Sequence, residues 1–194
     1  MSMFIQMSGF PGSGKSTLAR EIGKRTGAVI VDHDVTKSAL MEKVGNGLTH
    51  DMAGKVSYHL DWSISESLLA QGHSVIFDSP CLYDEMVEKG TLLAEKYGIP
   101  YKYIECVVHD FTLTNERLRG RDRMPSQIKE VKSEEAFRKT VLNSKKPDGL
   151  PCLQIDTSSP ITSYITRVIR YLENGEGGVA GDWEVHGERE GCLL

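Results

Sequence analysis

A run of glycines followed by one lysine stands near the start of the chain, where residues 7–17 read MSGFPGSGKST. Glycines permit backbone conformations in which several N–H groups point at one anion, and a helix that begins after such a loop adds the positive end of its dipole. In the spacing Gly9-x-x-x-x-Gly14-Lys15-Ser16, the lysine reaches the β- and γ-phosphates of a nucleotide and the serine hydroxyl ligates Mg²⁺. The spacing predicts a phosphate-binding loop.

The residues that we predict to bind ATP lie in this loop or in the first turn of the helix that follows it. They are Gly9, Pro11, Gly12, Ser13, Gly14, Lys15, Ser16 and Thr17. Thr17 either contacts the α-phosphate or is an ordinary residue of the first helical turn. ATP and Mg²⁺ are therefore the ligands that this part of the chain predicts.

An aspartate that follows the third apolar run, in SVIFDSP, is the second candidate. Asp78 ends that run, which is where an acid of the Walker-B type stands to hold Mg²⁺ directly or through water. We predict that Asp78 and Ser16 hold the metal ion. An aspartate at a strand end is also a common turn residue, which is the alternative interpretation.

Two further aspartates follow the second apolar run, in VIVDHDVTKSAL. Asp32 and Asp34 are two residues apart, so in extended geometry their side chains point the same way, toward the site of the γ-phosphate. We predict that Asp34 is the catalytic base, with Asp32 as the other candidate. The alternative is that Asp34 caps the next helix and Asp32 is a solvated turn residue. His33 is expected to point the other way and to be structural.

A basic cluster follows the fourth apolar run. Residues 117–132 hold six lysines and arginines against two acidic residues. Such a run is usually a solvated face, but arginines are suited to neutralising a phosphoryl group in transfer. We predict that the cluster is a mobile lid and that Arg117 and Arg121 close on the transition state.

These residues need elements that bring them together, and the chain alternates short apolar runs with longer helical patterns. The runs at 3–7, 28–31, 74–77, 103–108 and 152–155 predict five parallel strands, with helices on both faces of the sheet. Ligands bind at the carboxyl ends of such strands, where the phosphate loop and the three aspartates are found. The helices are expected at 15–26, after 34, and at 52–71, 84–97, 112–119, after 133 and 161–172.

The third of these helices carries Val56, Leu60, Ile64 and Leu68 at intervals of four residues. Residues spaced in this way lie on one stripe of a helix. We therefore expect these four side chains to face the core.

With these residues in view, residues 3–172 resemble the small P-loop kinases that include polynucleotide 5′-hydroxyl kinases, chloramphenicol phosphotransferase and zeta-toxin-like kinases. The resemblance implies an α/β P-loop NTPase fold with a basic lid, in which Asp34 is the catalytic aspartate. The family's two lid arginines are four residues apart, as Arg117 and Arg121 are here. Where polynucleotide kinases have an acceptor-binding arginine, this chain has Lys37, which keeps the charge but loses the bidentate fork.

The ends of the chain differ in composition. We predict a kinase domain at 1–172 and a flexible, acidic, Gly-rich tail at 173–194, where six acidic residues and one basic residue stand. The net charge of the whole sequence is −4. No signal peptide or membrane-spanning segment is indicated, so a cytoplasmic protein with reduced thiols is expected.

Three functions stay open at this stage. The favoured one is a kinase that moves the γ-phosphate of Mg-ATP to a hydroxyl group of a small molecule. The second is a polynucleotide 5′-hydroxyl kinase, and the third is a nucleotide-dependent switch or ATPase without an acceptor. A GTPase is disfavoured because N-K-x-D is absent and the only D-x-x-G match, at Asp51, opens a predicted helix. The pattern does not predict the oligomeric state.

Overall fold

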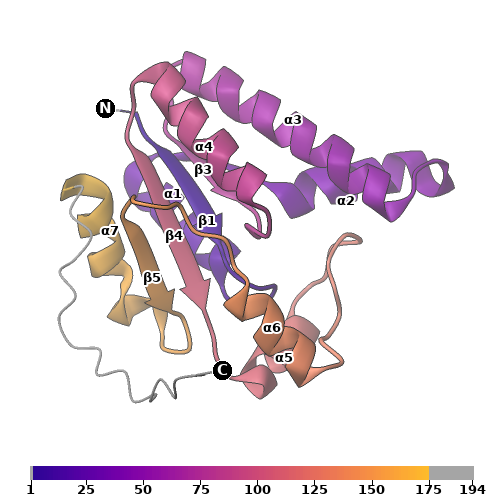
Figure 1. The fold of residues 1–194 in the computed structure, drawn as a ribbon. Helices are drawn as coiled ribbons and strands as arrows, with labels where there is room; N and C mark the ends of the chain where they lie inside the picture. Colours follow the sequence, from indigo (N-terminus) through magenta and orange to yellow (C-terminus); the bar gives the residue numbers. More distant parts are fainter. Residues whose placement is uncertain (1, 175–194) are drawn as a thin grey trace, which may run out of the picture.

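The computed structural model describes residues 2–174, and its centre is a five-stranded, all-parallel sheet (Figure 1). The strand order is β2-β3-β1-β4-β5, so the first strand lies in the middle. The bounds are β1 Phe4–Ser8, β2 Val29–Asp32, β3 Val75–Asp78, β4 Tyr101–Val107 and β5 Cys152–Asp156. The five predicted strands and their parallel arrangement are confirmed.

The helices follow the predicted order. Their bounds are α1 Lys15–Thr26, α2 His33–Val44, α3 His50–Ala70, α4 Asp84–Tyr97, α5 Phe111–Gly120, α6 Glu134–Leu142 and α7 Ile165–Asn174, with short 3₁₀ turns at Gly45–Gly47 and Ile161–Ser163. Side-chain caps set several starts. Thr49 accepts a hydrogen bond from the N–H of Met52 at the start of α3, and Asp110 and Ser133 cap α5 and α6 in the same way. The predicted tail beyond residue 174 lies outside the described residues.

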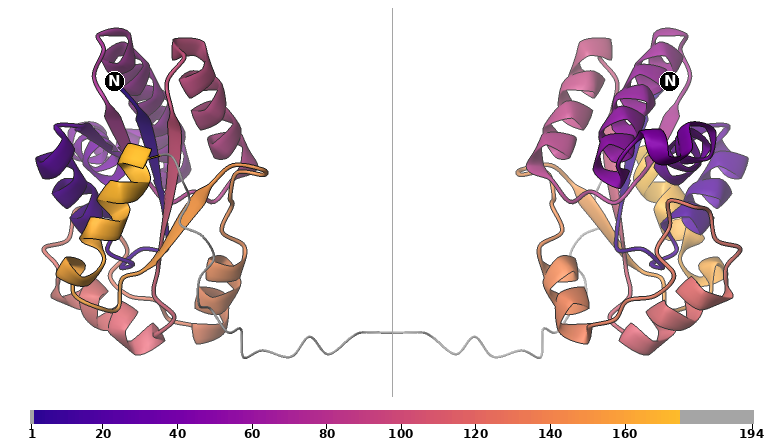
Figure 2. Two further views of the ribbon diagram at one scale, coloured as in Figure 1. Left: turned by 90° about the vertical axis from the view of Figure 1, so that its left-hand side faces the viewer. Right: turned by 90° about the vertical axis from the view of Figure 1, so that its right-hand side faces the viewer.

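The helices form a layer on each face of the sheet, as the alternation of strands and helices predicted. Leu18 and Ile22 of α1 and Val168 of α7 pack with Ile5 on one face, and all four are fully buried. On the other face, Phe4 packs with side chains of α3 and α4. The edge-on view in Figure 2 shows α4 and the yellow α7 on opposite sides of the strands. Neighbouring residues of β1 thus face different cores, as expected of a parallel strand covered on both faces.

Helix α3 corrects one prediction. Leu60 and Ile64 are 40% and 45% exposed, so these two side chains do not face the core, whereas Leu68 packs against it. The face that packs on the sheet carries Ala53, Ser57, Asp61, Ser65 and Leu69 instead. Its serines can be buried because each hydroxyl donates to the carbonyl four residues earlier, at 2.7 Å. Oδ2 of Asp61 is met by a residue of α2, described below, while its Oδ1 has no partner among residues 2–174.

The parallel strands end along one edge of the sheet, which gathers the loops after β1, β2, β3 and β5. Figure 1 shows α5 and α6 beyond the end of β4. Among residues 2–174, no helix has the length and apolar composition needed to cross a membrane. Cys81, Cys106 and Cys152 are free thiols, the first two buried.

Candidate active site

The loop between β1 and α1 has the backbone of a phosphate cradle. Gly9, Gly12 and Gly14 have φ angles of 136°, 87° and 83°, which side chains rarely tolerate. At Gly9 a Cβ atom would lie 2.3 Å from the carbonyl oxygen of Cys106, so the loop packs against β4 without space for a side chain. Helix α1 begins at Lys15 with no acidic residue in its first turn. Its N-terminal N–H groups are thus available to an anion.

The loop after β5 forms hydrogen bonds with the phosphate loop, and the sequence analysis did not predict this contact. The hydroxyl of Thr157 donates to the carbonyl oxygen of Ser13 at 2.5 Å. The guanidinium of Arg117 donates to the carbonyl oxygen of Thr157 at 2.7 Å. Thr157 therefore links α5 to the phosphate loop. The only signal in the sequence was its place directly after a strand, where ligand-binding residues of such sheets gather.

Asp78 lies at the end of β3 and its side chain is buried. Neither of its carboxylate oxygens has a hydrogen-bond partner among the residues that the structure describes. Burial raises the pKa of Asp78, while the nearby Lys15 and the hydroxyl of Ser16 oppose that rise. Mg²⁺ takes oxygen ligands, commonly one or two carboxylates together with phosphate oxygens and water. An unsatisfied buried carboxylate beside a serine hydroxyl fits that ion.

Asp32 is the helix cap, which corrects the alternative that assigned this role to Asp34. Its Oδ1 accepts hydrogen bonds from the N–H groups of Asp34 and Val35 and so starts α2 at His33. Burial, and then the charges of Asp78 and Asp34, raise the pKa of Asp32 to about 6. Asp32 is therefore a partly buried cap and not a solvated turn residue.

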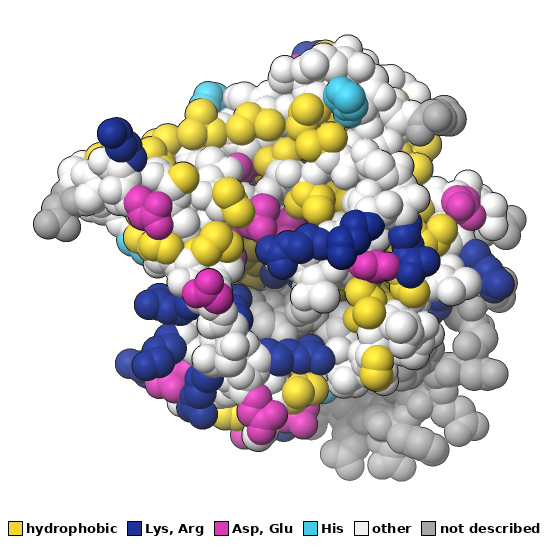
Figure 3. Space-filling model, turned by 180° about the vertical axis from the view of Figure 1, so that it is seen from behind, with side chains coloured by type: hydrophobic (Ala, Val, Ile, Leu, Met, Phe, Trp, Pro, Cys, Tyr) yellow, Lys and Arg dark blue, Asp and Glu magenta, His cyan; other side chains and the backbone are white. Residues whose placement is uncertain are grey.

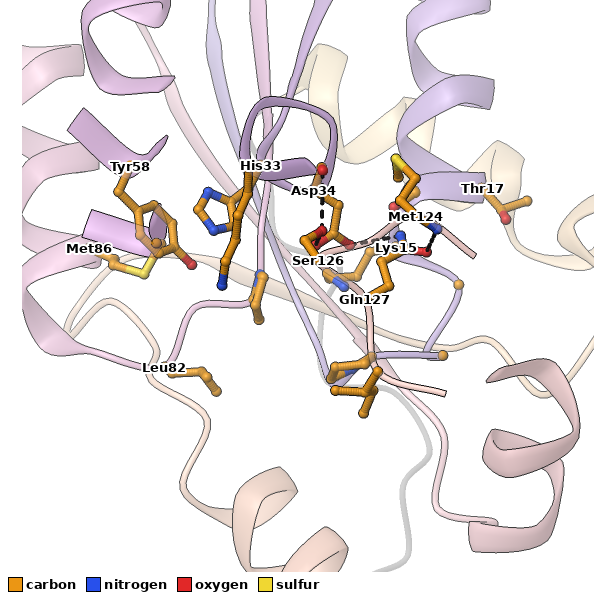
Figure 4. A pocket seen from close by; sticks show the side chains of 18 of the residues that line it. Lys15, Thr17, His33, Asp34, Tyr58, Leu82, Met86, Met124, Ser126 and Gln127 are labelled. Carbon is orange, nitrogen blue, oxygen red and sulfur yellow. Dashed lines mark hydrogen bonds between the residues drawn. The ribbon is translucent and has the colours of Figure 1, made fainter. Parts of the chain in front are cut away.

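Asp34, in the first turn of α2, is contacted by the segment that follows α5. The hydroxyl of Ser126 donates to Asp34 Oδ1 at 3.1 Å, and Nε2 of Gln127 donates to Oδ2 at 2.8 Å (Figure 4). Ser38, one turn along α2, accepts from the backbone N–H of Ser126 and donates to its hydroxyl. The N–H of Met124 donates to Gln127 Oε1, which fixes the orientation of that amide. Both oxygens of Asp34 are thus held by residues far away in sequence.

The basic cluster divides into two sets of side chains. Arg117 and Arg121 line the cleft described below. Arg121 Nη2 donates to the carbonyl oxygen of Ile128, and its buried Nε has no partner among residues 2–174. Arg119 instead forms an ion pair with Glu130, and Arg123 donates to a backbone carbonyl of its own loop. Only part of the cluster therefore lines the cleft.

A cleft of about 1640 Å³ joins these groups. Seen from behind, Lys and Arg side chains lie on both sides of a recess, and apolar side chains lie above it (Figure 3). Among the predicted site residues, the cleft is lined by Pro11, Gly12, Gly14, Lys15, Ser16, Thr17, Asp34, Arg117 and Arg121. Gly9, Ser13 and Asp78 are not part of the lining.

His33 belongs to the cleft wall, although the sequence suggested that it points away. Its Nδ1 lies 2.7 Å from Oδ2 of Asp61, a residue with no exposed surface. Its ring stacks on Tyr58 with centroids 3.7 Å apart and planes 13° apart. The prediction of a structural role fits these contacts, but the ring also lines the cleft. Asp61 and Tyr58, on α3, gave no local signal of this contact.

The family model described as an AAA domain, AAA_33, matches residues 4–140. No curated protein matches the chain.

Several solved structures share the fold at low sequence identity. A putative kinase from Chloroflexus aurantiacus is 20% identical, with a TM-score of 0.71 over 89% of this chain and 99% of that one. A sugar kinase from Janibacter is 19% identical, with a TM-score of 0.62 over 89% and 95%. The tunicamycin resistance protein of Deinococcus radiodurans is 15% identical, with a TM-score of 0.62 over 89% and 96%. These likenesses show the P-loop kinase-like fold.

Proposed function

The chain belongs to the AAA_33 family of AAA domains, and we propose that it is an ATP-dependent kinase that phosphorylates a hydroxyl group of a small molecule. One observation carries the proposal. A single cleft brings together the phosphate loop, the carboxylate of Asp34 and the guanidinium groups of Arg117 and Arg121. Phosphoryl transfer needs these parts: a site that holds the phosphates, a base for the hydroxyl proton and cations for the charge in transfer.

At the nucleotide end, the N–H groups of residues 12–16 bind the phosphates and Lys15 contacts the β- and γ-phosphates. Ser16 and Asp78 would hold Mg²⁺, which when bound draws charge from the phosphate oxygens. Beyond Arg117, the cleft is lined by Pro160, Ile161 and Tyr164, an apolar wall suited to the base of the nucleotide. Arg117 is fixed on that side by its bond to Thr157.

At the transfer point, the acceptor hydroxyl lies between the γ-phosphate and Asp34. Asp34 accepts its proton as the new O–P bond forms and the bond to ADP breaks, which typically contributes about 10²–10⁴-fold in rate. Arg121 meets the charge that develops on the transferring group. A preorganised donor of this kind contributes about 10²–10³-fold.

The volume of the cleft supports two ligands. Sites for one small molecule commonly measure about 300–1,000 Å³, and this cleft is larger. The proteins of similar structure include kinases of small molecules, among them a sugar kinase and a gluconokinase. These proteins are too distant in sequence for their substrates to be assigned to this chain. Kinase chemistry nevertheless agrees with the residues found in the cleft.

The test offers γ-labelled ATP together with nucleosides, aryl-bearing alcohols, sugars and 5′-hydroxyl oligonucleotides. The proposal expects label on a small-molecule acceptor, and Lys15→Ala should abolish it. Lys24→Ala is the matched control, because Lys24 is exposed on the last turn of the same helix. Wild-type transfer by Lys15→Ala would overturn the assignment of the phosphate loop. Slow formation of ADP that no acceptor accelerates would favour the nucleotide switch.

A further inference from the structure

The cleft continues past His33 into the space between α3 and α4. Figure 4 shows Tyr58, Met86 and Leu82 on the far side of His33 from Lys15 and Thr17. We call this region the acceptor end and define it by Tyr58, Trp62, Leu82, Tyr83 and Met86, which line the cleft. Resting on the kinase function proposed above, we propose that the acceptor is an uncharged alcohol with a planar ring, bound with its ring at the acceptor end.

The aromatic side chains of the acceptor end are held in place by stacking on neighbouring rings of the protein. Trp62 stacks on Phe77 of β3, with centroids 4.2 Å apart and planes 20° apart. Tyr58 stacks on His33, whose ring is held in turn by Asp61. Rings that are fixed before the ligand arrives lose little freedom on binding, so they favour a flat partner of matching shape.

Two apolar residues at the mouth of the acceptor end have side chains that are exposed to solvent. Leu82 is 39% exposed and Tyr83 is 63% exposed, next to the buried Met86. Neighbouring exposed apolar side chains inside a cleft mark a surface that a ligand covers. Because the cleft is continuous with the phosphate loop, that ligand is the acceptor and not a separate molecule.

Lys and Glu or Asp side chains alternate near the acceptor end, which disfavours a polyanionic acceptor. Lys55 pairs with Asp51 at 2.8 Å, and Lys89 pairs with Glu85 at 2.9 Å. Lys37 lies near both Asp34 and Asp51, and burial lowers its pKa. Among the described residues that line the cleft, the arginines are found on α1 and around α5, at the nucleotide end. A nucleic acid would need unpaired cations along its phosphates.

The polar contact of the acceptor end is His33, the residue next to the proposed base. Asp61 holds Nδ1 and leaves the other ring nitrogen for a ligand. The ring of the acceptor thus lies beside Trp62, and a polar group of the acceptor forms a hydrogen bond with His33. This orientation directs its hydroxyl toward Asp34.

The experiment measures kcat/KM with saturating Mg-ATP for four acceptors: uridine, phenylpropanediol, sorbitol and a 5′-hydroxyl oligonucleotide. The kcat/KM for uridine or for phenylpropanediol should exceed that for both other acceptors by about 10-fold or more, which is the discrimination that an apolar pocket provides. Their comparison distinguishes a nucleoside from an aryl-bearing alcohol. Equal or better use of sorbitol or the oligonucleotide would overturn the ring proposal but leave the kinase function intact.

Matched variants test the same surface without altering the core. Leu82→Ser and Tyr83→Ser should each raise the KM of the better ring-bearing acceptor by about 10-fold, because each loses apolar contact with it. Leu92→Ser is the control, since Leu92 is 55% exposed on α4 and does not line the cleft. If Leu82→Ser and Tyr83→Ser change the KM no more than Leu92→Ser does, the proposal is contradicted.

A binding measurement decides the case in which no acceptor is phosphorylated. Calorimetric titration of uridine and phenylpropanediol into protein saturated with Mg²⁺ and a non-hydrolysable ATP analogue should show saturable binding that Leu82→Ser weakens. Absence of binding by both probes would overturn the ring proposal. Binding of a probe without phosphate transfer would instead overturn the kinase function and leave the acceptor end as a ligand site.

Discussion

Replacement of Asp34 by Asn tests the proposed base directly. The amide is nearly the same size and still accepts a hydrogen bond, but it cannot take a proton. Loss of a base costs about 10²–10⁴-fold, which corresponds to about 2.7–5.4 kcal/mol in the activation barrier. We expect kcat with the best acceptor to fall by that factor, while the affinity for Mg-ATP stays close to that of the wild type.

The contacts of Asp34 set the expected change in stability. Its carboxylate accepts from Ser126 and Gln127, and the amide of Gln127 is fixed by Met124 with its donors toward Asp34. An Asn at this position keeps one acceptor and places its NH₂ group against another donor. One charged hydrogen bond is worth about 1.5–3 kcal/mol, so the melting temperature should fall by a few degrees.

Gln127→Ala is the matched control, because it removes one of the two side-chain hydrogen bonds to Asp34 and keeps the carboxylate. It should lose comparable stability but retain kcat within about 10-fold, since the base remains. Asp32→Asn should also reduce kcat less than Asp34→Asn does, because Asn is an equally good helix cap. A rate close to wild type for Asp34→Asn, measured with labelled ATP, would refute the assignment and direct the search to Asp32 or Asp78.

Three further predictions concern the nucleotide end. Arg121→Ala should lower kcat by about 100-fold while changing ATP affinity far less, because the guanidinium meets charge that develops in the transition state. Arg119→Ala is the control, and its kcat should stay near that of the wild type, because Arg119 pairs with Glu130. An equal loss of rate and ATP affinity would make Arg121 a ground-state contact. Asp78→Asn should raise the Mg²⁺ concentration for half-maximal activity by about 10-fold or more, and an unchanged Mg²⁺ titration would remove Asp78 from the metal site. Gly9→Ala should lower the free energy of unfolding by about 2–4 kcal/mol in urea titrations, because its Cβ would meet the Cys106 carbonyl, and an unchanged midpoint would contradict the strain.

The strands and the phosphate loop could be predicted because their signals are local. A parallel strand buried on both faces is a short apolar run, and the loop is defined by the spacing of Gly9, Gly14 and Lys15. The topology rule then placed Asp34 and Asp78 at one edge of the sheet without further information.

The errors arose where the packing of an element, and not its own apolar pattern, decides the outcome. Apolar periodicity placed Leu60 and Ile64 in the core, but the packed face of α3 carries serines that satisfy their hydroxyls within the helix. Asp61 is buried because His33 meets it across 28 positions of sequence. The contact between Asp34 and Gln127 spans 93 positions. No pattern within one element reports such pairs.

Under the proposed kinase function, the hydrogen bonds on Asp34 bear on how ATP would be kept from reacting with water. With Asp34 as the base, a water molecule that enters beside bound ATP competes with Ser126 and Gln127, each of which already donates to one carboxylate oxygen. An alcohol anchored elsewhere in the cleft has binding energy with which to displace one of them, and water has none. The same two hydrogen bonds would thus delay the breakdown of ATP until its proper recipient is present.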